Sequence, residues 1–412
     1  MQLKQQLNQL LARVRGQGLA GQLTRGGIGS IGIKISNTLL GLTLSIILAR
    51  TLGPEGYGTY AYIFALVTVL SIPAQFGIPK LVIRETATAQ VNQDWGLMFG
   101  IWQWSRYIII GLCLILIVTA GSVAYFTKAQ YSEAQLLTFL FGLLLIPFIA
   151  LVRLYSAALQ GLRYVVQAQV ADSVIRPGLL ILFTLSVVFL KTNILTPERV
   201  MGLHVLSSIV AFIVSYWMLS IKSPVRYRSK IVLKRDTNAW FASVWPLAIA
   251  SGMQQINQQT DLIMLGLFAP VGDVGAYRVA TRGSILVVFG LQSIAMFISP
   301  FLARLHAQRK IERLEIVASI SSTIGLLVAL PVLIVFIFWG NEIIGFMFGK
   351  GYAGAYAPLI ILGVGQTVNA LFGPVGFMLN MAGHEKINAR WLIVSAGLNV
   401  VLNLLLIPSL GI

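Results

Sequence analysis

Long apolar runs, each about as long as a bilayer-spanning helix, alternate with short connections along most of the chain. Hydrophobic residues make up 57% of the 412 residues and charged residues 10%, far from the averages of soluble domains. A helix needs about 20 apolar residues to cross a bilayer. Eleven runs meet this requirement, at roughly 28–50, 59–79, 105–126, 134–156, 168–190, 199–221, 240–268, 276–303, 316–339, 356–380 and 389–408. The pattern predicts an all-α polytopic membrane protein.

The basic residues are divided unevenly between the two sets of connections. The N-terminal arm and the even-numbered connections hold 22 Lys and Arg residues, whereas the odd-numbered connections hold 5. Because Lys and Arg in short loops favour the cytosolic side, this asymmetry predicts a cytosolic N-terminus. Most of the formal net charge of +17 then lies on one side of the membrane, beside anionic lipid headgroups. Membrane lipids are therefore expected partners, and nucleic acid is not.

Turn-forming positions recur across the chain at a nearly constant offset. The segment Gly53-Pro54-Glu55-Gly56-Tyr57-Gly58 matches Ala269-Pro270-Val271-Gly272-Asp273-Val274-Gly275 with one residue inserted, and Pro79 with Pro300 and Gly161 with Gly383 follow at similar offsets. This order predicts a duplicated six-helix unit whose two copies keep the same orientation.

The repeat sets the expected organisation: a basic cytosolic arm at 1–27, a first six-helix bundle at 28–221, a basic cytosolic linker at 222–239 and a second bundle at 240–412. The run at 199–221 has no counterpart in the second copy. We therefore expect the second bundle to lack its last helix, to expose a groove there, and to leave Asn399 or Asn403 without a partner. In the arm, apolar residues from Leu3 to Val14 recur at helical spacing, which predicts a surface amphipathic helix or, alternatively, a disordered basic tail.

Sequence motifs of enzyme chemistry are absent. His204, His306 and His384 are scattered and do not show the spacing of a zinc site. The sequence contains neither a nucleophile elbow nor a complete phosphate-binding loop. We therefore expect a transporter rather than an enzyme, with no cofactor and no bound metal.

Several ionisable and amide side chains fall inside the apolar runs, where a charge costs about 2.5 kcal/mol or more on insertion scales. The candidate substrate-binding residues of a cavity are Lys34, Asn37, Gln258, Asp261, Arg278 and Arg282. Arg278 and Arg282 are four residues apart and share one helix face. The surplus of positive charge favours a cationic cavity for an anionic head group, in which Asp261 orients one arginine or takes up a proton. Two alternatives remain open: Asp261 pairs with an arginine to lock two helices, and Lys34 extends to the membrane surface.

The segment Leu48-Ala49-Arg50-Thr51-Leu52-Gly53-Pro54-Glu55-Gly56-Tyr57-Gly58, followed by an apolar helix, resembles the opening of the polysaccharide-flippase (Wzx-like) family. That family belongs to the superfamily that also holds MATE multidrug transporters and the lipid II flippase MurJ. The resemblance covers about 25–408. Supporting segments are Asp261-Leu-Ile-Met-Leu-Gly266, Leu159-Gln160-Gly161 and Phe348-Gly349-Lys350-Gly351-Tyr352.

The resemblance implies a MATE-like fold, in which two six-helix bundles surround an alternately opening cavity. It also implies a flippase that moves undecaprenyl-diphosphate-linked oligosaccharide from the cytosolic to the periplasmic leaflet of the bacterial inner membrane. The pathway would be lipopolysaccharide or exopolysaccharide biosynthesis, with a proton or sodium as coupling ion and a polysaccharide polymerase complex as a partner. Members usually have more helices than the eleven found here.

Rival functions make different demands on the sequence. A drug or cation exporter of the same fold would be expected to have an acidic cavity. A membrane-embedded glycan polymerase or ligase would need a sizeable outer loop for its acceptor and catalytic groups, whereas the outer connections here are short. A purely structural membrane protein would not require charges inside its spans.

Overall fold

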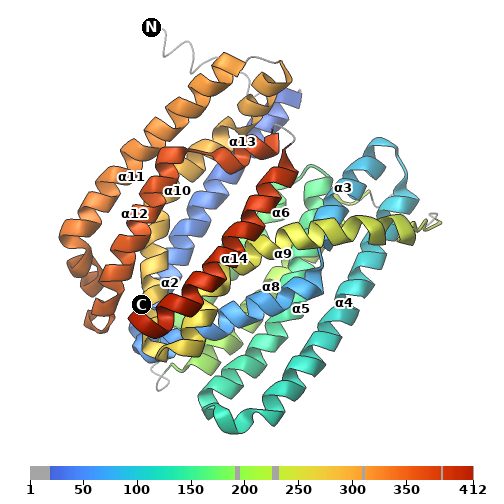
Figure 1. The fold of residues 1–412 in the computed structure, drawn as a ribbon. Coiled ribbons are helices and arrows are strands. Elements are labelled where there is room, and N and C mark those ends of the chain that lie inside the picture. The colour runs from blue at the N-terminus through green and yellow to red at the C-terminus, as the bar shows by residue number, and fades with distance from the viewer. Residues whose placement is uncertain (1–18, 191–194, 225–231, 309–310, 382–383, 412) are drawn as a thin grey trace.

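The computed structural model describes residues 19–190, 195–224, 232–308, 311–381 and 384–411, so the predicted amphipathic segment at 3–14 lies outside the described residues. Within the described residues, every regular element is helical. The elements are α2 (Leu19–Gln75), α3 (Ile78–Val91), α4 (Trp95–Phe126), η1 (Lys128–Gln130), α5 (Glu133–Gly161), α6 (Val165–Val170), η2 (Ala171–Ile175), α7 (Arg176–Phe189), α8 (Pro197–Lys222), α9 (Thr237–Phe268), α10 (Val271–Ala307), α11 (Ile311–Met347), η4 (Lys350–Ala355), α12 (Tyr356–Phe372), α13 (Val375–Met381) and α14 (Glu385–Leu410). Figure 1 shows α3 to α8 on one side and α10 to α13 on the other, with α9 and α14 running between them.

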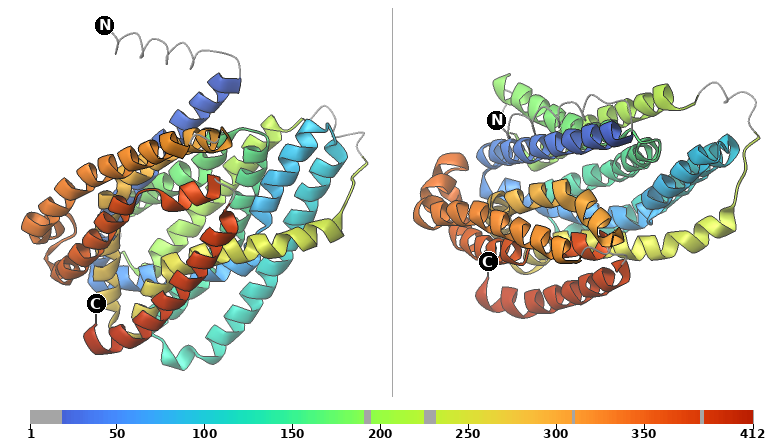
Figure 2. Two further views of the ribbon diagram at one scale, coloured as in Figure 1. Left: turned by 45° about the horizontal axis from the view of Figure 1, so that its top comes forward. Right: turned by 90° about the horizontal axis from the view of Figure 1, so that it is seen from above.

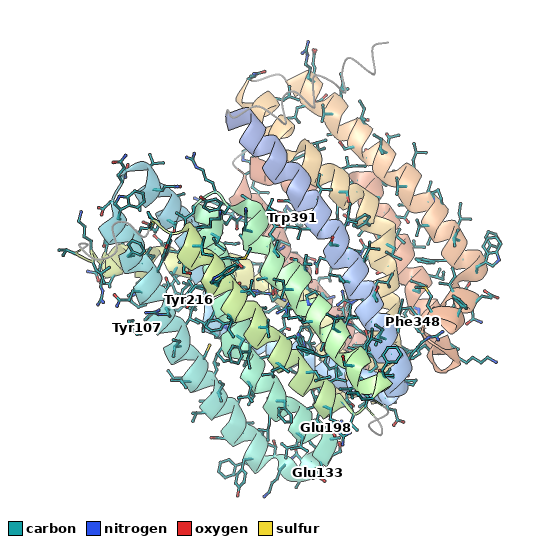
Figure 3. The ribbon with its side chains drawn as sticks, turned by 180° about the vertical axis from the view of Figure 1, so that it is seen from behind. Tyr107, Glu133, Glu198, Tyr216, Phe348 and Trp391 are labelled. Atoms are coloured by element: carbon teal, nitrogen blue, oxygen red, sulfur yellow. The ribbon has the colours of Figure 1, made fainter. Side chains whose placement is uncertain are left out.

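Residues predicted to lie on the same side of the membrane gather at the same end of the molecule. Glu133, Glu198 and Phe348 lie toward one end, which we call the outer end (Figure 3). Tyr107, Tyr216 and Trp391 lie toward the opposite end, which we call the inner end (Figure 3). The helices therefore connect two ends in the alternating manner that the basic-residue pattern predicts.

Each of the eleven predicted spans is mostly helical. Nine helices of the described residues are long and apolar enough to cross a membrane. One of them, α2, contains two spans that meet at Gly53, where φ is +67° and only glycine is unstrained. Helix α9 carries the remaining span, and it falls short of this apolar criterion because its second half holds the polar stretch 254–261.

Some predicted boundaries are wrong. The predicted span 356–380 is interrupted after Phe372, because Gly373 adopts a φ of +77° before α13 begins. The connection between the second and third predicted spans contains a helix, α3, which follows a break at Phe76 and Gly77 with φ of 41° and 70°. Helix α2 also begins at Leu19, well before the predicted start at 28.

The two repeats meet at the outer end through a reciprocal glycine crossing. A methyl group on Gly58 would overlap the carbonyl oxygen of Val271, and a methyl group on Gly275 would overlap the carbonyl oxygen of Pro54. Val271 and Gly275 follow Pro54 and Gly58 by the same offset along the chain. An exchange of equivalent contacts is what a local two-fold relation produces. The repeat is less regular at the predicted pair of Pro79 and Pro300. Pro79 lies in the first turn of α3, whereas α10 continues through Pro300.

The outer end carries further contacts between the two halves. The Arg50 guanidinium on α2 donates through Nε to the carbonyl oxygen of Met347 at 2.8 Å, and through Nη2 to that of Phe346. The Tyr352 hydroxyl donates to the carbonyl oxygen of Ala49 at 2.9 Å. The outer end is therefore closed by hydrogen bonds from α2 and η4 to backbone carbonyls of the opposite half.

Helix α14 runs alongside α9 (Figures 1 and 2). Apolar side chains along its length, from Trp391 to Leu405, are exposed. The expectation that Asn399 or Asn403 lacks a partner is wrong, because each amide donates to the Asp261 carboxylate. Whether a further helix would cover the exposed face of α14 stays a prediction.

The described part of the basic linker is held against the first bundle at the inner end. The Lys234 ammonium forms an ion pair with Asp94 at 2.9 Å, and Asp94 also caps α4 by accepting a hydrogen bond from the Leu97 N–H. Methyl groups on Gly96 or Gly100 would meet backbone oxygens of the linker. Beyond the linker, the first half of α9 packs on the first bundle, where Trp240 contacts Trp104 with ring centroids 5.4 Å apart. The start of α9 is thus fixed to the first half of the molecule.

Candidate functional site

One face of the first half of α2 carries a line of polar or small residues at helical spacing. From the inner to the outer end, these residues are Ser30, Lys34, Asn37, Gly41 and Ser45. Ser30 contacts the Gln169 amide of α6 at 3.3 Å, and the Ser45 hydroxyl lies 2.5 Å from the Tyr57 hydroxyl. Lys34 is partly buried and Asn37 is exposed. This face therefore links the inner part of the first bundle to the outer crossing.

Arg282 of α10 reaches this face of α2. A methyl group on Gly41 would lie 3.6 Å from Arg282 Nη1, so the absence of a side chain at Gly41 leaves room for the guanidinium. The Arg282 Nε is buried and has no hydrogen-bond partner. Arg278, one turn earlier on α10, is partly buried and within electrostatic range of Arg282. Within the described residues, no carboxylate forms an ion pair with either arginine.

Asp261 lies in a separate hydrogen-bonded cluster. Its Oδ1 accepts from the amide groups of Asn399 and Asn403 at 2.8 Å each, and its Oδ2 accepts from the Tyr277 hydroxyl at 2.9 Å. The alternative in which Asp261 pairs with Arg278 or Arg282 is therefore wrong, and so is the role of orienting an arginine. The cluster joins α9, α10 and α14 through one carboxylate.

A second hydrogen-bonded group lies between α2 and α8. The Tyr60 hydroxyl lies 2.9 Å from His204 Nδ1, and the Phe64 ring packs on the imidazole with centroids 5.1 Å apart. Tyr60 is within electrostatic range of Arg176, Arg278 and Arg282. Arginines of both α7 and α10 thus lie close enough to act on Tyr60 electrostatically.

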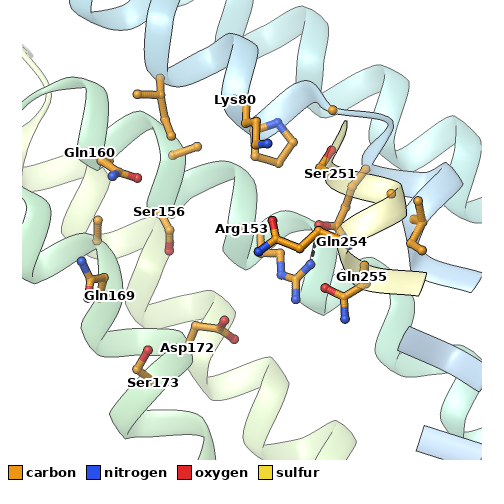
Figure 4. A pocket seen from close by; sticks show the side chains of 18 of the residues that line it. Lys80, Arg153, Ser156, Gln160, Gln169, Asp172, Ser173, Ser251, Gln254 and Gln255 are labelled. Atoms are coloured by element: carbon orange, nitrogen blue, oxygen red, sulfur yellow. Dashed lines mark hydrogen bonds between the residues drawn. The ribbon is translucent and has the colours of Figure 1, made fainter. Parts of the chain in front are cut away.

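A cavity of about 420 Å³ lies on the inner side of this group. It is an open cavity lined by α2, α3, α5, α6, η2 and α9, and Figure 4 shows the polar side chains that line it. Nine of the 19 lining residues are neutral and polar: Gln75, Ser156, Gln160, Gln169, Ser173, Ser251, Gln254, Gln255 and Gln258. The charged residues of the lining are Lys80, Arg153 and Asp172. Asp172 forms an ion pair with Arg176 at 3.0 Å.

The structure brings some of the predicted site residues together and separates others. Gln258 lines the cavity, and Lys34 lies on the α2 face that Arg282 reaches at Gly41. Asp261 belongs to its own cluster. Arg153, which falls within the predicted span 134–156 but is not one of the six candidate residues, lies inside α5 and lines the cavity. The spacing of Arg153, Ser156 and Gln160 along one helix face was the signal that could have identified it.

A family model described as "Polysaccharide biosynthesis protein" matches residues 23–306, more than half of the chain. The chain belongs to the polysaccharide biosynthesis protein family. A MatE model matches residues 246–405 of the second half. The resemblance noted from the Gly53-Pro54 segment is thereby confirmed.

Two curated proteins of Haloferax volcanii are similar to this family member in sequence. The "Probable flippase AglR" is 23% identical over 398 residues, which cover 95% of this chain and 79% of AglR. The "Probable low-salt glycan biosynthesis flippase Agl15" is 29% identical over 152 residues, which cover 37% of this chain and 32% of Agl15. The match with Agl15 thus spans about a third of that protein.

Solved structures of transporters share the fold. The lipid II flippase MurJ in an inward closed conformation superposes with a TM-score of 0.71 at 16% identity, over 93% of this chain and 82% of MurJ. An inward-facing multidrug MATE transporter of the MOP superfamily gives 0.68 at 15% identity, over 91% of this chain and 88% of the transporter. The polysaccharide biosynthesis protein described here therefore has a MATE-like transporter fold.

Proposed function

We propose that this protein is a flippase for a lipid-linked oligosaccharide. Its substrate would be carried on undecaprenyl diphosphate and would pass from the cytosolic to the periplasmic leaflet of a bacterial inner membrane during surface polysaccharide biosynthesis. The family match and the two flippase relatives support this class of function. The basic inner connections support the orientation, with the N-terminus in the cytosol.

The observation that carries the proposal is the Arg282 guanidinium, whose buried Nε has no hydrogen-bond partner and which forms no ion pair with a carboxylate of the described residues. A buried cation that lacks a carboxylate partner is costly unless it binds an anion during the functional cycle. A guanidinium matches the geometry of phosphate oxygens and can bind them through two parallel hydrogen bonds. With Arg278 beside it, Arg282 offers a diphosphate two positive charges at the seam between the two halves. The polyprenyl chain can remain in the surrounding lipid while its diphosphate binds there.

Lys34 extends this site toward the inner end. It precedes Gly41 by two helical turns, which corresponds to about 10 Å along α2. An anionic head group that enters from the cytosolic leaflet would meet Lys34 first and Arg282 second. We propose that this order of cations guides the diphosphate into the molecule. The positive charges of Lys34 and Arg282 disfavour the alternative of an exporter, in which the cavity would bind organic cations.

The proposal is tested by transport in reconstituted vesicles. The probe is a fluorescent undecaprenyl-diphosphate N-acetylglucosamine, and dithionite reports how much probe remains in the protected leaflet. Arg282→Ala should slow transport about tenfold or more, because a charge-assisted hydrogen bond contributes about 1.5–3 kcal/mol. Arg282→Lys should recover only part of the rate, since an ammonium cannot form the two-pronged contact.

Two controls separate binding from folding. Lys128→Ala removes a positive charge from the outer η1 turn and should transport at the wild-type rate. Fluorescent phosphatidylcholine should not be transported by any variant. Normal transport by the Arg278→Ala, Arg282→Ala double variant would show that the arginine pair does not carry the substrate.

A further inference from the structure

The cavity around Arg153 differs in chemistry from the site at Arg278 and Arg282. Its wall consists of six glutamine and three serine side chains, together with three charged residues and seven small or apolar ones. Amides and hydroxyls are the groups that pair with sugar hydroxyls, because each can donate and accept a hydrogen bond. A diphosphate needs cations instead. The composition of this wall therefore suits a glycan better than a phosphate group.

Arg153 places a positive charge among these neutral hydrogen-bonding side chains. It projects from α5 toward the side of the cavity formed by α2 and α9, and its Nη1 donates to Gln75 Oε1 at 2.9 Å (Figure 4). A guanidinium has five N–H donors, so one amide oxygen satisfies a small part of its capacity. The one carboxylate among the lining residues, Asp172, forms an ion pair with Arg176. Lys80 adds a second positive charge to the lining, which leaves the cavity with a positive surplus.

The two cationic sites are separated along α2. The cavity adjoins the inner part of α2, where Ser30 contacts Gln169 of the cavity wall, whereas Arg282 lies beside Gly41. Eleven residues of helix correspond to about 16 Å, and a diphosphate spans only a few ångströms. The electrostatic neighbours also differ: Asp172 and Arg176 for Arg153, but Arg278, Tyr57 and Tyr60 for Arg282. One diphosphate cannot occupy both sites.

We propose that the cavity lined by Arg153 binds the glycan part of the substrate and that Arg153 recognises an acidic group on it, such as the carboxylate of a uronic acid. This inference rests on the proposed flippase function, in which Arg278 and Arg282 bind the diphosphate. The glutamine side chains of α9 bind neutral hydroxyls, and Arg153 supplies the charge that distinguishes an acidic glycan from a neutral one. The transported head group then carries negative charge at two places, the diphosphate and the acidic group of the glycan.

Binding measurements on the purified chain in nanodiscs test this assignment. Three probes are compared: trigalacturonate, the neutral galactotriose of the same linkage, and farnesyl diphosphate. The wild-type protein should bind trigalacturonate about tenfold or more tightly than galactotriose, as expected for charge-assisted hydrogen bonds. Arg153→Gln should abolish this preference and leave the affinity for farnesyl diphosphate unchanged. Arg282→Gln should do the reverse.

Further variants exclude an indirect effect. Lys128→Gln removes one positive charge far from the cavity and should preserve every affinity. Arg153→Lys keeps a charge at the site and should retain part of the preference, while its melting temperature shows that the fold is intact. Equal binding of the two trisaccharides by the wild type, or a preference that survives in Arg153→Gln, would overturn the assignment. Farnesyl diphosphate binding that is indifferent to Arg282→Gln would instead overturn the proposed diphosphate site.

Discussion

Gly58 and Gly275 contact each other's helices in a reciprocal manner, so that the outer ends of α2 and α10 cross at backbone distance. The would-be methyl group of Gly58 overlaps the carbonyl oxygen of Val271, and that of Gly275 overlaps the carbonyl oxygen of Pro54. A crossing of this kind has no flexible side chain that could move aside. It joins the two halves firmly when the outer end is closed, and it must separate when that end opens.

Substitution at this crossing should be costly. Gly58→Ala forces the helices apart, and overpacking of this kind costs about 1–3 kcal/mol. We expect a lower melting temperature in detergent and a larger share of molecules with an open outer end. Gly202→Ala is the matched control, because a methyl group there meets no atom within 4 Å. A Gly58→Ala variant that is as stable as Gly202→Ala would show that the crossing is not tight in the membrane.

Loss of the Arg50 contacts should shift the equilibrium between molecules with a closed outer end and molecules with an open one. Arg50 donates to the carbonyl oxygens of Met347 and Phe346, and hydrogen bonds from a charged group contribute about 1.5–3 kcal/mol. Arg50→Ala should therefore raise the population of an outward-open form about tenfold or more. Spin labels at Thr127 and Lys350, in a Cys113→Ala background, would report a longer distance. Lys222→Ala, at the inner end, should leave the label distance unchanged.

The predicted topology has its own test. A reporter fused after Lys234 should be found in the cytosol, and one fused at Lys350 should be found outside the membrane. The prediction follows from the excess of basic residues in the even-numbered connections. Location of both reporters on the same side would contradict the succession of eleven spans.

The pH dependence of stability should include a contribution from the linker. The hydrogen bond from Lys234 holds the pKa of Asp94 below its ordinary value of 3.8. A carboxyl whose pKa is lowered by folding stabilises the protein above its ordinary pKa, and this contribution is lost as the pH falls toward the folded value. The melting temperature of the wild type should exceed that of Asp94→Asn at pH 6, and the difference should shrink below about pH 4. A difference that grows on acidification would contradict this account.

The spans and the kink at Gly53 could be predicted because they depend on local sequence. Apolar length defines a span, and a Gly-Pro pair after an apolar run favours a break in the helix. The repeat was visible for the same reason, since turn residues recur at one offset. That Arg153 lines a cavity could not be predicted from the sequence, because its spacing with Ser156 and Gln160 is equally compatible with an exposed polar face near the inner end of α5.

The partners of Asp261 lay beyond sequence reasoning for a different reason. Asn399 and Asn403 are more than 130 positions away, and no local pattern connects them with α9. Arginines on the next helix were the nearer candidates in sequence, yet α14 rather than the arginine face of α10 packs on Asp261. Which residues become the partners of Asp261 depends on how α9, α10 and α14 pack. Sequence periodicity alone does not determine this packing.

The Asp261 cluster allows a role in coupling transport to an ion gradient to be tested. Its carboxylate, the two asparagine amides and the Tyr277 hydroxyl are oxygen-bearing groups that can hold a proton or a sodium ion. Asp261→Asn preserves the size and most hydrogen bonds of the side chain but removes its charge. We expect it to fold normally and to lose the stimulation of transport by a proton or sodium gradient.

Asp261→Leu separates this role from structural support. It leaves the Asn399, Asn403 and Tyr277 side chains without their shared acceptor, and each buried unsatisfied group costs about 1–3 kcal/mol. Its melting temperature should therefore fall well below that of Asp261→Asn. Asn369→Leu is the matched control, because Asn369 is exposed and its amide donates a long hydrogen bond, 3.4 Å, to Gln366. If Asp261→Asn transports with the wild-type rate and gradient dependence, the carboxylate holds three helices together and does not carry the coupling ion.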